Sequence, residues 1–241
     1  MNNLHINKIV DFSYVDGPGN RLVLFLQGCN FNCQYCHNPE TIPERKAKSY
    51  TVEETFNYII KRKDYIAGVT ASGGECTLQW EPLMKLFAKL KEQTQLTTFI
   101  DTNGNVCDKK MDALLGYTDG FMIDLKAVNY DTHKRITGKG NEQVIKTIKK
   151  AVKHNKLYEL RYVLIPEIND SKNDLKDLAN FIKYLNAETY LMLIPYRNQG
   201  VVGEFKSLPS MTEDQYNRIL KTMYSLGLEK IIKKRNFFCK N

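Results

Sequence analysis

The feature that most constrains this chain is a regular alternation of short β-branched runs with amphipathic stretches along nearly its whole length. The β-branched runs are typical of buried strands, and the stretches between them have apolar residues at helical spacing. Alternation at this spacing favours parallel βαβ units with right-handed crossovers. The six predicted strands are Arg21–Gln27, Ala67–Ala71, Thr97–Asp101, Gly120–Leu125, Glu159–Ile165 and Thr189–Pro195.

A predicted helix follows each strand. The first, Thr51–Lys63, opens with Thr51 and Glu54 at the spacing of a capping box. The second, Glu81–Gln93, has Pro82 in its first turn, where proline is tolerated. Because the pattern supplies six units rather than eight, an open doubly wound sheet and an incomplete barrel are the alternatives. The remaining helices are expected to begin near Asp108, Asp131, Asn141, Ser171 and Thr212.

Composition limits the class of protein but does not identify a partner. The 241 residues include 35 Lys and Arg against 27 Asp and Glu, a net charge of +8 that allows an acidic partner of any kind. A hydrophobic content of 42% excludes intrinsic disorder, and six cysteines are too few for a disulfide-stapled scaffold. With no signal peptide, membrane-length apolar run or linker evident, we expect one cytoplasmic domain, residues 1–241.

Polar, charged and glycine residues collect where the predicted strands end, which is where parallel βα folds bind their ligands. Ser72–Glu75 follows the second strand; its two glycines allow close backbone approach, and Glu75 suits an ammonium group. Asp101 and Asp124 end consecutive strands, where carboxylates repel unless a cation separates them or one is protonated. Arg161 lies inside an apolar strand and needs a partner. A binding site is therefore predicted at this edge of the sheet.

Three of the six cysteines, Cys29, Cys33 and Cys36, lie within eight positions of one another in the loop after the first strand. In a reducing compartment, such clustered thiols indicate a metal site. Structural zinc needs four closed ligands, and Cys76 could supply the fourth only if the fold brought it close. Three thiolates suit a [4Fe–4S] cluster with one open iron. Three incidental buried thiols are the alternative.

The segment Gly28–Asn38 (GCNFNCQYCHN) resembles the cluster loop of the radical S-adenosylmethionine enzymes. Within them, the chain is most similar to the glycyl-radical-enzyme activating family, and the similarity extends in order from about Ile9 to Arg197. The resemblance implies the α/β class with a partial (β/α)6 barrel, open and TIM-like, with parallel strands. The further matching blocks are VDGPG (15–19), GVTASGGE (68–75), DTNG (101–104), DLK (124–126) and RYVLIP (161–166).

The resemblance implies one [4Fe–4S] cluster, held by Cys29, Cys33 and Cys36, with S-adenosylmethionine bound at the open iron. Reductive cleavage gives a 5′-deoxyadenosyl radical, which takes hydrogen from a glycine of a partner glycyl radical enzyme, so no side chain is implied as an acid or base catalyst. Asp101 and Asp124 are implied to help bind ribose, methionine and a monovalent cation. The other implied cofactor contacts are Tyr35, His37, Ser72, Gly73, Gly74, Glu75, Thr102, Asn103, Lys126, Arg161 and Arg197, and Asp16, His37 and Asn38 are implied to meet the protein substrate.

The chain departs from the family pattern at several places. Arg197 stands where some members have a cofactor-contacting His after Pro-Tyr. Cys76 follows Glu75 where Pro or Ala is usual, and we expect it to be a small packing residue, with Cys107 and Cys239 also outside the site. The segment from residue 39 to 50 is short and holds no cysteine. We therefore expect a single cluster and no ferredoxin-like insert.

Two other functions stay open on the sequence alone. A radical S-adenosylmethionine enzyme acting on RNA or a small molecule fits the charge of +8, although no RNA-binding module is recognisable. A non-catalytic iron–sulfur module for electron transfer would leave the polar strand ends unexplained. The expected partners are a glycyl radical enzyme and a flavodoxin or ferredoxin-like electron donor, with neither nucleic acid nor membrane, and we expect a monomer. The basic run Lys230–Lys240 is expected to be a solvated surface tail.

Overall fold

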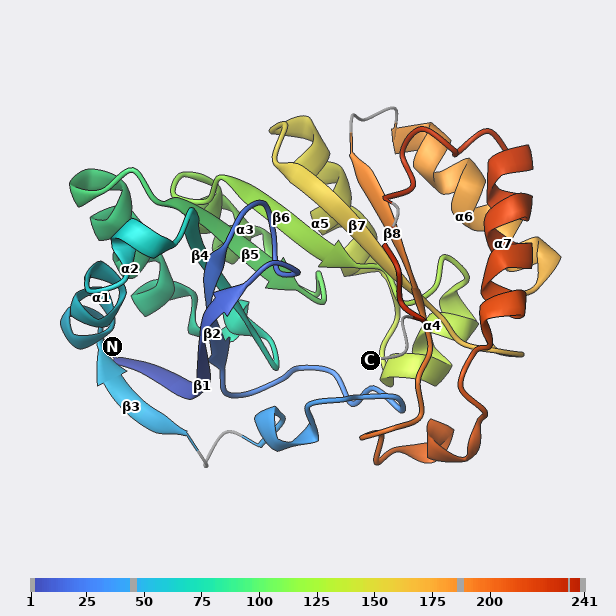
Figure 1. Cartoon of the computed structure of the whole chain (residues 1–241), viewed down its shortest axis with the longest axis horizontal. Coiled ribbons are helices and arrows are strands. Elements are labelled where there is room, and N and C mark those ends of the chain that lie inside the picture. The colour runs from blue at the N-terminus through green and yellow to red at the C-terminus, as the bar shows by residue number, and fades with distance from the viewer. Residues whose placement is uncertain (1–2, 44–46, 186–188, 234, 239–241) are drawn as a thin grey trace.

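The computed structural model describes residues 3–43, 47–185, 189–233 and 235–238. The strands form one eight-stranded sheet in the order β3-β1-β2-β4-β5-β6-β7-β8. The sheet is curved, as Figure 1 shows. The six strands from β2 to β8 are parallel neighbours in chain order, and β3 and β8 form the two edges. The predicted open α/β barrel is thereby confirmed. These strands are β2 (Arg21–Leu26), β4 (Gly68–Gly73), β5 (Thr97–Thr102), β6 (Gly120–Asp124), β7 (Leu157–Leu164) and β8 (Tyr190–Pro195).

The helices follow the strands as predicted. Thr51 caps the first one: its hydroxyl accepts a hydrogen bond from the Glu54 backbone amide (3.1 Å), while the Glu54 carboxylate accepts one from the Thr51 amide (2.7 Å). The α-helices are α1 (Val52–Ile60), α2 (Trp80–Gln93), α3 (Asp108–Leu115), α4 (Tyr130–Thr137), α5 (Glu142–Lys153), α6 (Lys172–Leu185) and α7 (Glu213–Ser225); the 3-10 turns are η1 (Pro39–Thr41), η2 (Lys63–Tyr65), η3 (Cys76–Gln79) and η4 (Glu204–Ser207).

Two strands were not predicted from the sequence. β1 (Asn3–Ser13) pairs antiparallel with β2, and β3 (Lys48–Thr51) pairs antiparallel with β1. β1 alternates buried and exposed residues only in its first half, and β3 has just four residues with none fully buried. Such segments gain their ladder hydrogen bonds from neighbours far along the chain, so their local patterns are weak. They extend the sheet beyond β2 and leave the parallel core unchanged.

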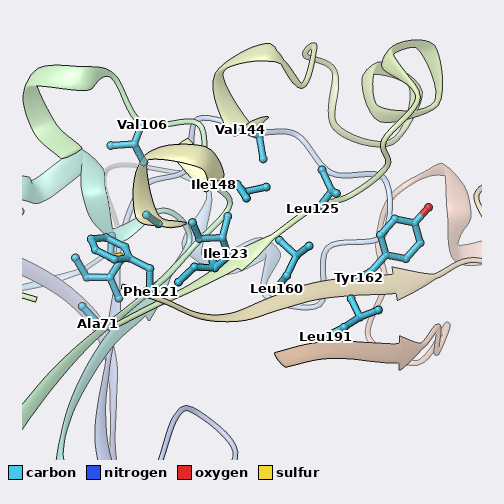
Figure 2. Close-up of a cluster of buried hydrophobic side chains, with 14 of the residues drawn as sticks. Ala71, Val106, Phe121, Ile123, Leu125, Val144, Ile148, Leu160, Tyr162 and Leu191 are labelled. Atoms are coloured by element: carbon cyan, nitrogen blue, oxygen red, sulfur yellow. The ribbon is translucent and has the colours of Figure 1, made fainter. Parts of the chain in front are cut away.

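The main hydrophobic core lies between the sheet and its helices. Figure 2 shows Val144 and Ile148 of α5 against Ile123 of β6 and Leu160 of β7, all fully buried. Because side chains alternate along a strand, the residues between these core positions point to the opposite face of the sheet. That face carries the charged residues at the strand ends. No helix in the described ranges is long and apolar enough to cross a bilayer.

Candidate active site

A cavity of about 470 Å³ lies at the carboxyl ends of the parallel strands. Its volume is within the range of small-molecule sites, roughly 300–1,000 Å³. Residues from the β2 loop and from the ends of β4 to β8 line it, so the cavity lies at the edge of the sheet where the sequence predicts a binding site. The predicted site residues that line it are Cys29, Cys33, Tyr35, Cys36, His37, Asn38, Ser72, Gly73, Gly74, Asp101, Thr102, Asn103, Asp124, Lys126, Arg161 and Arg197.

Backbone hydrogen bonds hold the cysteine loop in place. The Gly28 amide donates to the Thr41 carbonyl (2.7 Å), and the Cys36 amide donates to the Cys33 carbonyl (3.1 Å) in a tight turn. The middle of the loop is held by α4, because the Gln34 amide donates to the Ile136 carbonyl (2.9 Å). These backbone hydrogen bonds fix the conformation of the loop and do not involve its three thiols.

The environment of the three thiols fits a cluster better than a single ion. Burial raises the pKa of Cys33 to about 12, although the Lys126 ammonium lowers it in part, and burial also raises the pKa values of Cys29 and Cys36. Thiolates in this site therefore need a positive partner. Among the described residues, no three His, Cys, Asp or Glu side chains converge on one metal ion. In a [4Fe–4S] cluster each thiolate binds a different iron, so such convergence is not required.

The glycines after β4 pack directly against the β2 backbone. Gly73 has a φ of +123°, a conformation that favours glycine, and the Gly74 amide donates to the Leu26 carbonyl (3.0 Å). The Glu75 amide then donates to the Gly28 carbonyl (2.7 Å). These bonds hold the Ser72–Glu75 turn against the start of the cysteine loop. The turn therefore brings Gly73 and Gly74 to the cavity wall.

The expectation that Glu75 meets a ligand ammonium group does not fit the structure. Its carboxylate is fully buried and outside the cavity lining, where it accepts hydrogen bonds from the Thr77 hydroxyl (2.6 Å), the Thr102 hydroxyl (2.8 Å) and the Asn103 amide (2.8 Å). Burial raises the pKa of Glu75, and these bonds counteract the rise. Glu75 thus fixes the loop after β5, and it presents Thr102 and Asn103 to the cavity.

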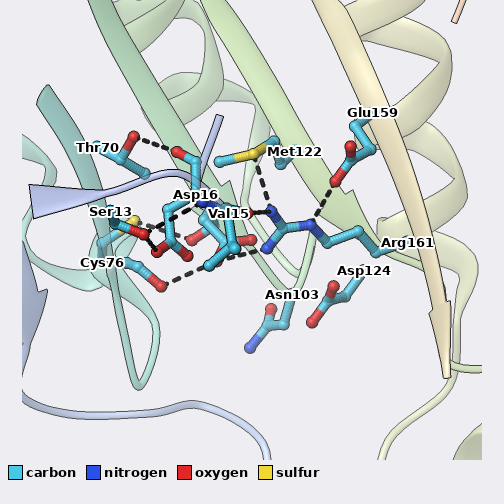
Figure 3. Close-up of polar contacts among 12 residues, drawn as sticks. Ser13, Val15, Asp16, Thr70, Cys76, Asn103, Met122, Asp124, Glu159 and Arg161 are labelled. Carbon is cyan, nitrogen blue, oxygen red and sulfur yellow. Dashed lines mark hydrogen bonds and ion pairs between the residues drawn. The ribbon is translucent and has the colours of Figure 1, made fainter. Parts of the chain in front are cut away.

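Two acid–base pairs occupy the cavity floor. Asp101 Oδ2 lies 3.0 Å from Arg161 Nη1 and accepts a hydrogen bond from the Ser72 hydroxyl (2.9 Å). Asp124 Oδ2 lies 2.6 Å from Lys126 Nζ. Figure 3 shows Arg161 between Glu159 and the side of the site that holds Asp16. Each carboxylate therefore contacts a basic side chain of the chain itself, and a monovalent cation between them stays a prediction.

Asp101 makes the stability of this group of charged side chains depend on pH. Burial raises its pKa, Arg161 lowers it and Asp124 raises it again, with a net value of about 6. An acid with a raised folded-state pKa binds its proton more tightly when folded, so its contribution to stability falls as pH rises from about 4 to about 6. We expect the free energy of unfolding of the cluster-free wild-type chain to fall by about 1–3 kcal/mol relative to Asp101→Asn over this window. Urea denaturation of both proteins measures the difference, and parallel pH profiles would contradict it.

The cysteine loop contacts the segment after β8 at the cavity. His37 Nε2 lies 2.8 Å from the Arg197 carbonyl oxygen, across 160 positions of sequence. The Arg197 guanidinium donates to the Phe237 carbonyl rather than pointing freely into the cavity. Tyr35 is only 5% exposed, its ring packs edge-on to Tyr196, and the Lys126 ammonium lies 5.3 Å from the ring centroid. Contacts of these residues with a cofactor stay predictions.

Asp16, expected on the substrate-facing loops, lies outside the cavity lining. It is in the turn between β1 and β2, where its carboxylate accepts a hydrogen bond from the Ser13 hydroxyl (2.5 Å) and its carbonyl accepts one from the Thr70 hydroxyl (2.6 Å). The turn does reach the site through Val15, whose carbonyl accepts a hydrogen bond from Arg161 Nη2 (3.2 Å). The turn thus contacts the cavity floor through its backbone.

Sequence reasoning missed several residues of the cavity wall. Apolar positions such as Phe31 and Val163 carry no local sign of a binding role, although Val163 shares the inner face of β7 with Arg161. The C-terminal segment was expected to be in solvent and yet supplies three lining residues. The missed residues are Phe31, Thr41, Ile42, Val163, Ile194, Pro195, Arg235, Asn236 and Phe237. Of the remaining cysteines, Cys76 is buried in the main core, Cys107 is exposed, and Cys239 is outside the described residues.

Comparison with known proteins identifies the family of this chain. The family model of the Radical SAM superfamily matches residues 23–182. The chain is 37% identical over 207 residues to the pyruvate formate-lyase-activating enzyme of Staphylococcus aureus (strain USA300), and the match covers 82% of each chain. Sequence identity at this level over most of both chains establishes a shared family, and members of that family are oxidoreductases.

Solved structures agree on the fold. A domain of the pyruvate-formate lyase-activating enzyme from Bacteroides vulgatus ATCC 8482 superposes with a TM-score of 0.60 at 22% identity, covering 70% of this chain and 99% of that one. Streptococcus suis SuiB bound to its precursor peptide SuiA superposes with a TM-score of 0.72 at 15% identity, covering 95% of this chain and 50% of that one. With its cysteine loop and strand-end residues in one cavity, the chain belongs to the radical S-adenosylmethionine superfamily and, within it, to the glycyl-radical-enzyme activating family.

Proposed function

We propose that this protein is an activase that installs a glycyl radical on a partner enzyme, using one [4Fe–4S] cluster and S-adenosylmethionine. The observation that carries the proposal is the shared cavity: three thiols stand on one wall, and Lys126 and Arg161 stand on the floor. The identity of 37% with a pyruvate formate-lyase-activating enzyme supports the activase class over other radical chemistry. Residues 1–241 are proposed to form a single radical S-adenosylmethionine domain.

In this proposal the chain's own residues bind and orient the cluster and S-adenosylmethionine. Cys29, Cys33 and Cys36 hold the cluster, whose chemistry is to supply the electron that cleaves S-adenosylmethionine. Lys126 and Arg161 attract the methionyl carboxylate, since both are buried cations at the cavity floor. The backbone of Ser72–Glu75 approaches the ligand closely because its glycines lack side chains. Transfer of a hydrogen atom from a glycine to a carbon radical moves the proton together with its electron, so no acid or base is needed.

The protein substrate is proposed to approach from the side of the cysteine loop. His37 and Asn38 line the cavity at its rim, and Asp16 lies in the β1–β2 turn that contacts Arg161 through Val15. The neighbouring Tyr14 is 77% exposed and offers apolar surface to a polypeptide. A flavodoxin or ferredoxin-like protein is proposed as electron donor, because an acidic surface complements the net charge of +8.

Isotope transfer tests the proposed reaction. A candidate glycyl radical enzyme is labelled with α-deuterated glycine and incubated anaerobically with the reconstituted, reduced protein and S-adenosylmethionine. The expected result is deuterium in 5′-deoxyadenosine, because the deoxyadenosyl radical takes its hydrogen atom from the glycine. If deuterium stays out of 5′-deoxyadenosine while an RNA or small molecule in the mixture is modified, the protein is a radical enzyme of another class.

A further inference from the structure

Part of the C-terminal basic run, residues 231–233, pairs with β8, so the expectation of a solvated tail is wrong for these residues; residues 234, 239 and 240 of the run lie outside the described residues. After α7 the chain runs parallel to β8: the Leu191 amide donates to the Ile231 carbonyl (2.9 Å), and the Lys233 amide donates to the Leu191 carbonyl (2.9 Å). Ile232 is 5% exposed and packs in the main core. In Figure 1 this dark-red segment passes beside β8.

The same segment continues to the cavity. The Phe237 carbonyl accepts a hydrogen bond from Arg197, directly after β8, and the Phe237 ring packs edge-on to Tyr216 of α7 (6.0 Å between centroids). Arg235, Asn236 and Phe237 all line the cavity. The segment therefore extends from the start of β8 to the site at its carboxyl end.

A chain of ion pairs, which runs from the partly exposed Lys233 through the buried Glu159 to Arg161, connects this segment with the cavity floor. Lys233 Nζ lies 3.0 Å from Glu159 Oε2, and Glu159 Oε1 accepts a hydrogen bond from Arg161 Nε (2.7 Å). Arg161 Nη1 then meets Asp101 Oδ2 at 3.0 Å. The Glu159 side chain is only 2% exposed, and Figure 3 shows it joined to the Arg161 guanidinium on the side away from Asp16.

The contacts of Glu159 hold the Arg161 guanidinium in one orientation. A buried carboxylate is costly unless it is paired, and each of its oxygens has one cationic partner, Arg161 or Lys233. Because the guanidinium is a planar fork, fixing Nε at Glu159 fixes the direction of Nη1 and Nη2, which reach Asp101 and Val15. Glu159 itself does not line the cavity, so it acts only through Arg161.

We propose that Glu159 is a positioning residue for Arg161 in the S-adenosylmethionine site, and that Lys233 holds Glu159 in place, which makes the C-terminal segment part of that site. Without Lys233, the Glu159 carboxylate pairs with Arg161 alone and draws the guanidinium away from Asp101. The inference rests on the proposed cofactor. It does not depend on the identity of the protein substrate.

Kinetics of S-adenosylmethionine cleavage in the absence of a protein partner test the inference. For Lys233→Met we expect the KM for S-adenosylmethionine to rise by about five- to tenfold, while kcat changes by less than about twofold. The reason is that the variant loses binding energy that the ground state and the transition state share equally. Lys233→Arg should keep KM within about twofold of wild type, since it retains the charge. Lys230→Met, an exposed change in the same segment, is the matched control. A glycyl radical enzyme that fails to be activated would leave this assay unaffected.

A second readout uses the cluster-free chain and needs no catalysis. The Arg161 Nε–H signal in a proton–nitrogen spectrum, identified by its loss in Arg161→Lys, reports the bond to Glu159. We expect it to shift in Lys233→Met and Glu159→Gln but to stay in place in Lys233→Arg and Lys230→Met. An unchanged KM with an unchanged Nε–H signal in Lys233→Met would overturn the inference. So would a lower melting temperature as the sole effect of Lys233→Met.

Discussion

Replacement of Cys33 by alanine is expected to abolish cluster assembly and to lower the rate of S-adenosylmethionine cleavage by more than about 1,000-fold, or about 4 kcal/mol in activation free energy. Cys33 is the middle thiol of the loop, and burial raises its pKa to about 12. Because burial disfavours a free thiolate at this position, we expect the Cys33 thiolate to form as an iron ligand, and the alanine variant lacks that ligand. Iron content after anaerobic reconstitution and release of 5′-deoxyadenosine measure the two effects.

Cys107→Ala is the matched control for this change. Cys107 is exposed and precedes α3, outside the cavity lining. We expect its loss to leave iron content and cleavage within about twofold of wild type, as is usual for a surface substitution. Undiminished cleavage by the Cys33 variant, with four irons per chain, would contradict the assignment of the cluster to Cys29, Cys33 and Cys36.

The second large effect is expected for Gly73→Ala. A Cβ atom at this position would lie 2.2 Å from the Leu26 carbonyl oxygen and 2.3 Å from the Leu26 nitrogen, both in the backbone of β2. The φ of +123° adds strain for any residue with a side chain. We expect the free energy of unfolding to fall by about 3 kcal/mol or more, because neither backbone can yield without breaking the β2–β4 ladder. Thermal and urea unfolding of the cluster-free chain measure the loss.

Gly138→Ala separates the steric clash from the backbone strain. Gly138 ends α4 with a φ of +80°, and a Cβ there would meet nothing within 4 Å. The expected cost is therefore only about 1 kcal/mol, from the left-handed conformation alone. If the two alanine variants lose the same stability, close contact between β4 and β2 does not explain the glycine at position 73.

The parallel part of the fold was predictable because its signals are local. Strands such as Gly120–Asp124 are continuous apolar runs, and the caps at Thr51 and Thr212 mark helix starts in the sequence itself. β1 and β3 escaped prediction because their pairing depends on neighbours far along the chain. The local pattern of a half-exposed or four-residue strand does not distinguish it from a loop.

The site was predictable where chemistry and position coincide. The cysteine spacing and the charged strand ends mark residues that the fold brings into one cavity. Glu75 was misassigned because its four hydrogen-bond donors come from Thr77 and from the β5 loop, which no local pattern reveals. Lys233 was missed for a similar reason: a lysine-rich segment looks solvated until Glu159 is found beside it.

Electron paramagnetic resonance of the partner enzyme is the most direct test of the activase function. The reduced, reconstituted protein is mixed anaerobically with S-adenosylmethionine and a candidate glycyl radical enzyme, and a parallel sample uses the Cys33→Ala variant. We expect a glycyl radical signal whose hyperfine splitting collapses when the partner carries α-deuterated glycine, and no signal with the variant. Cleavage of S-adenosylmethionine with no glycyl radical on any candidate partner, together with modification of an RNA or a small molecule, would contradict the activase function.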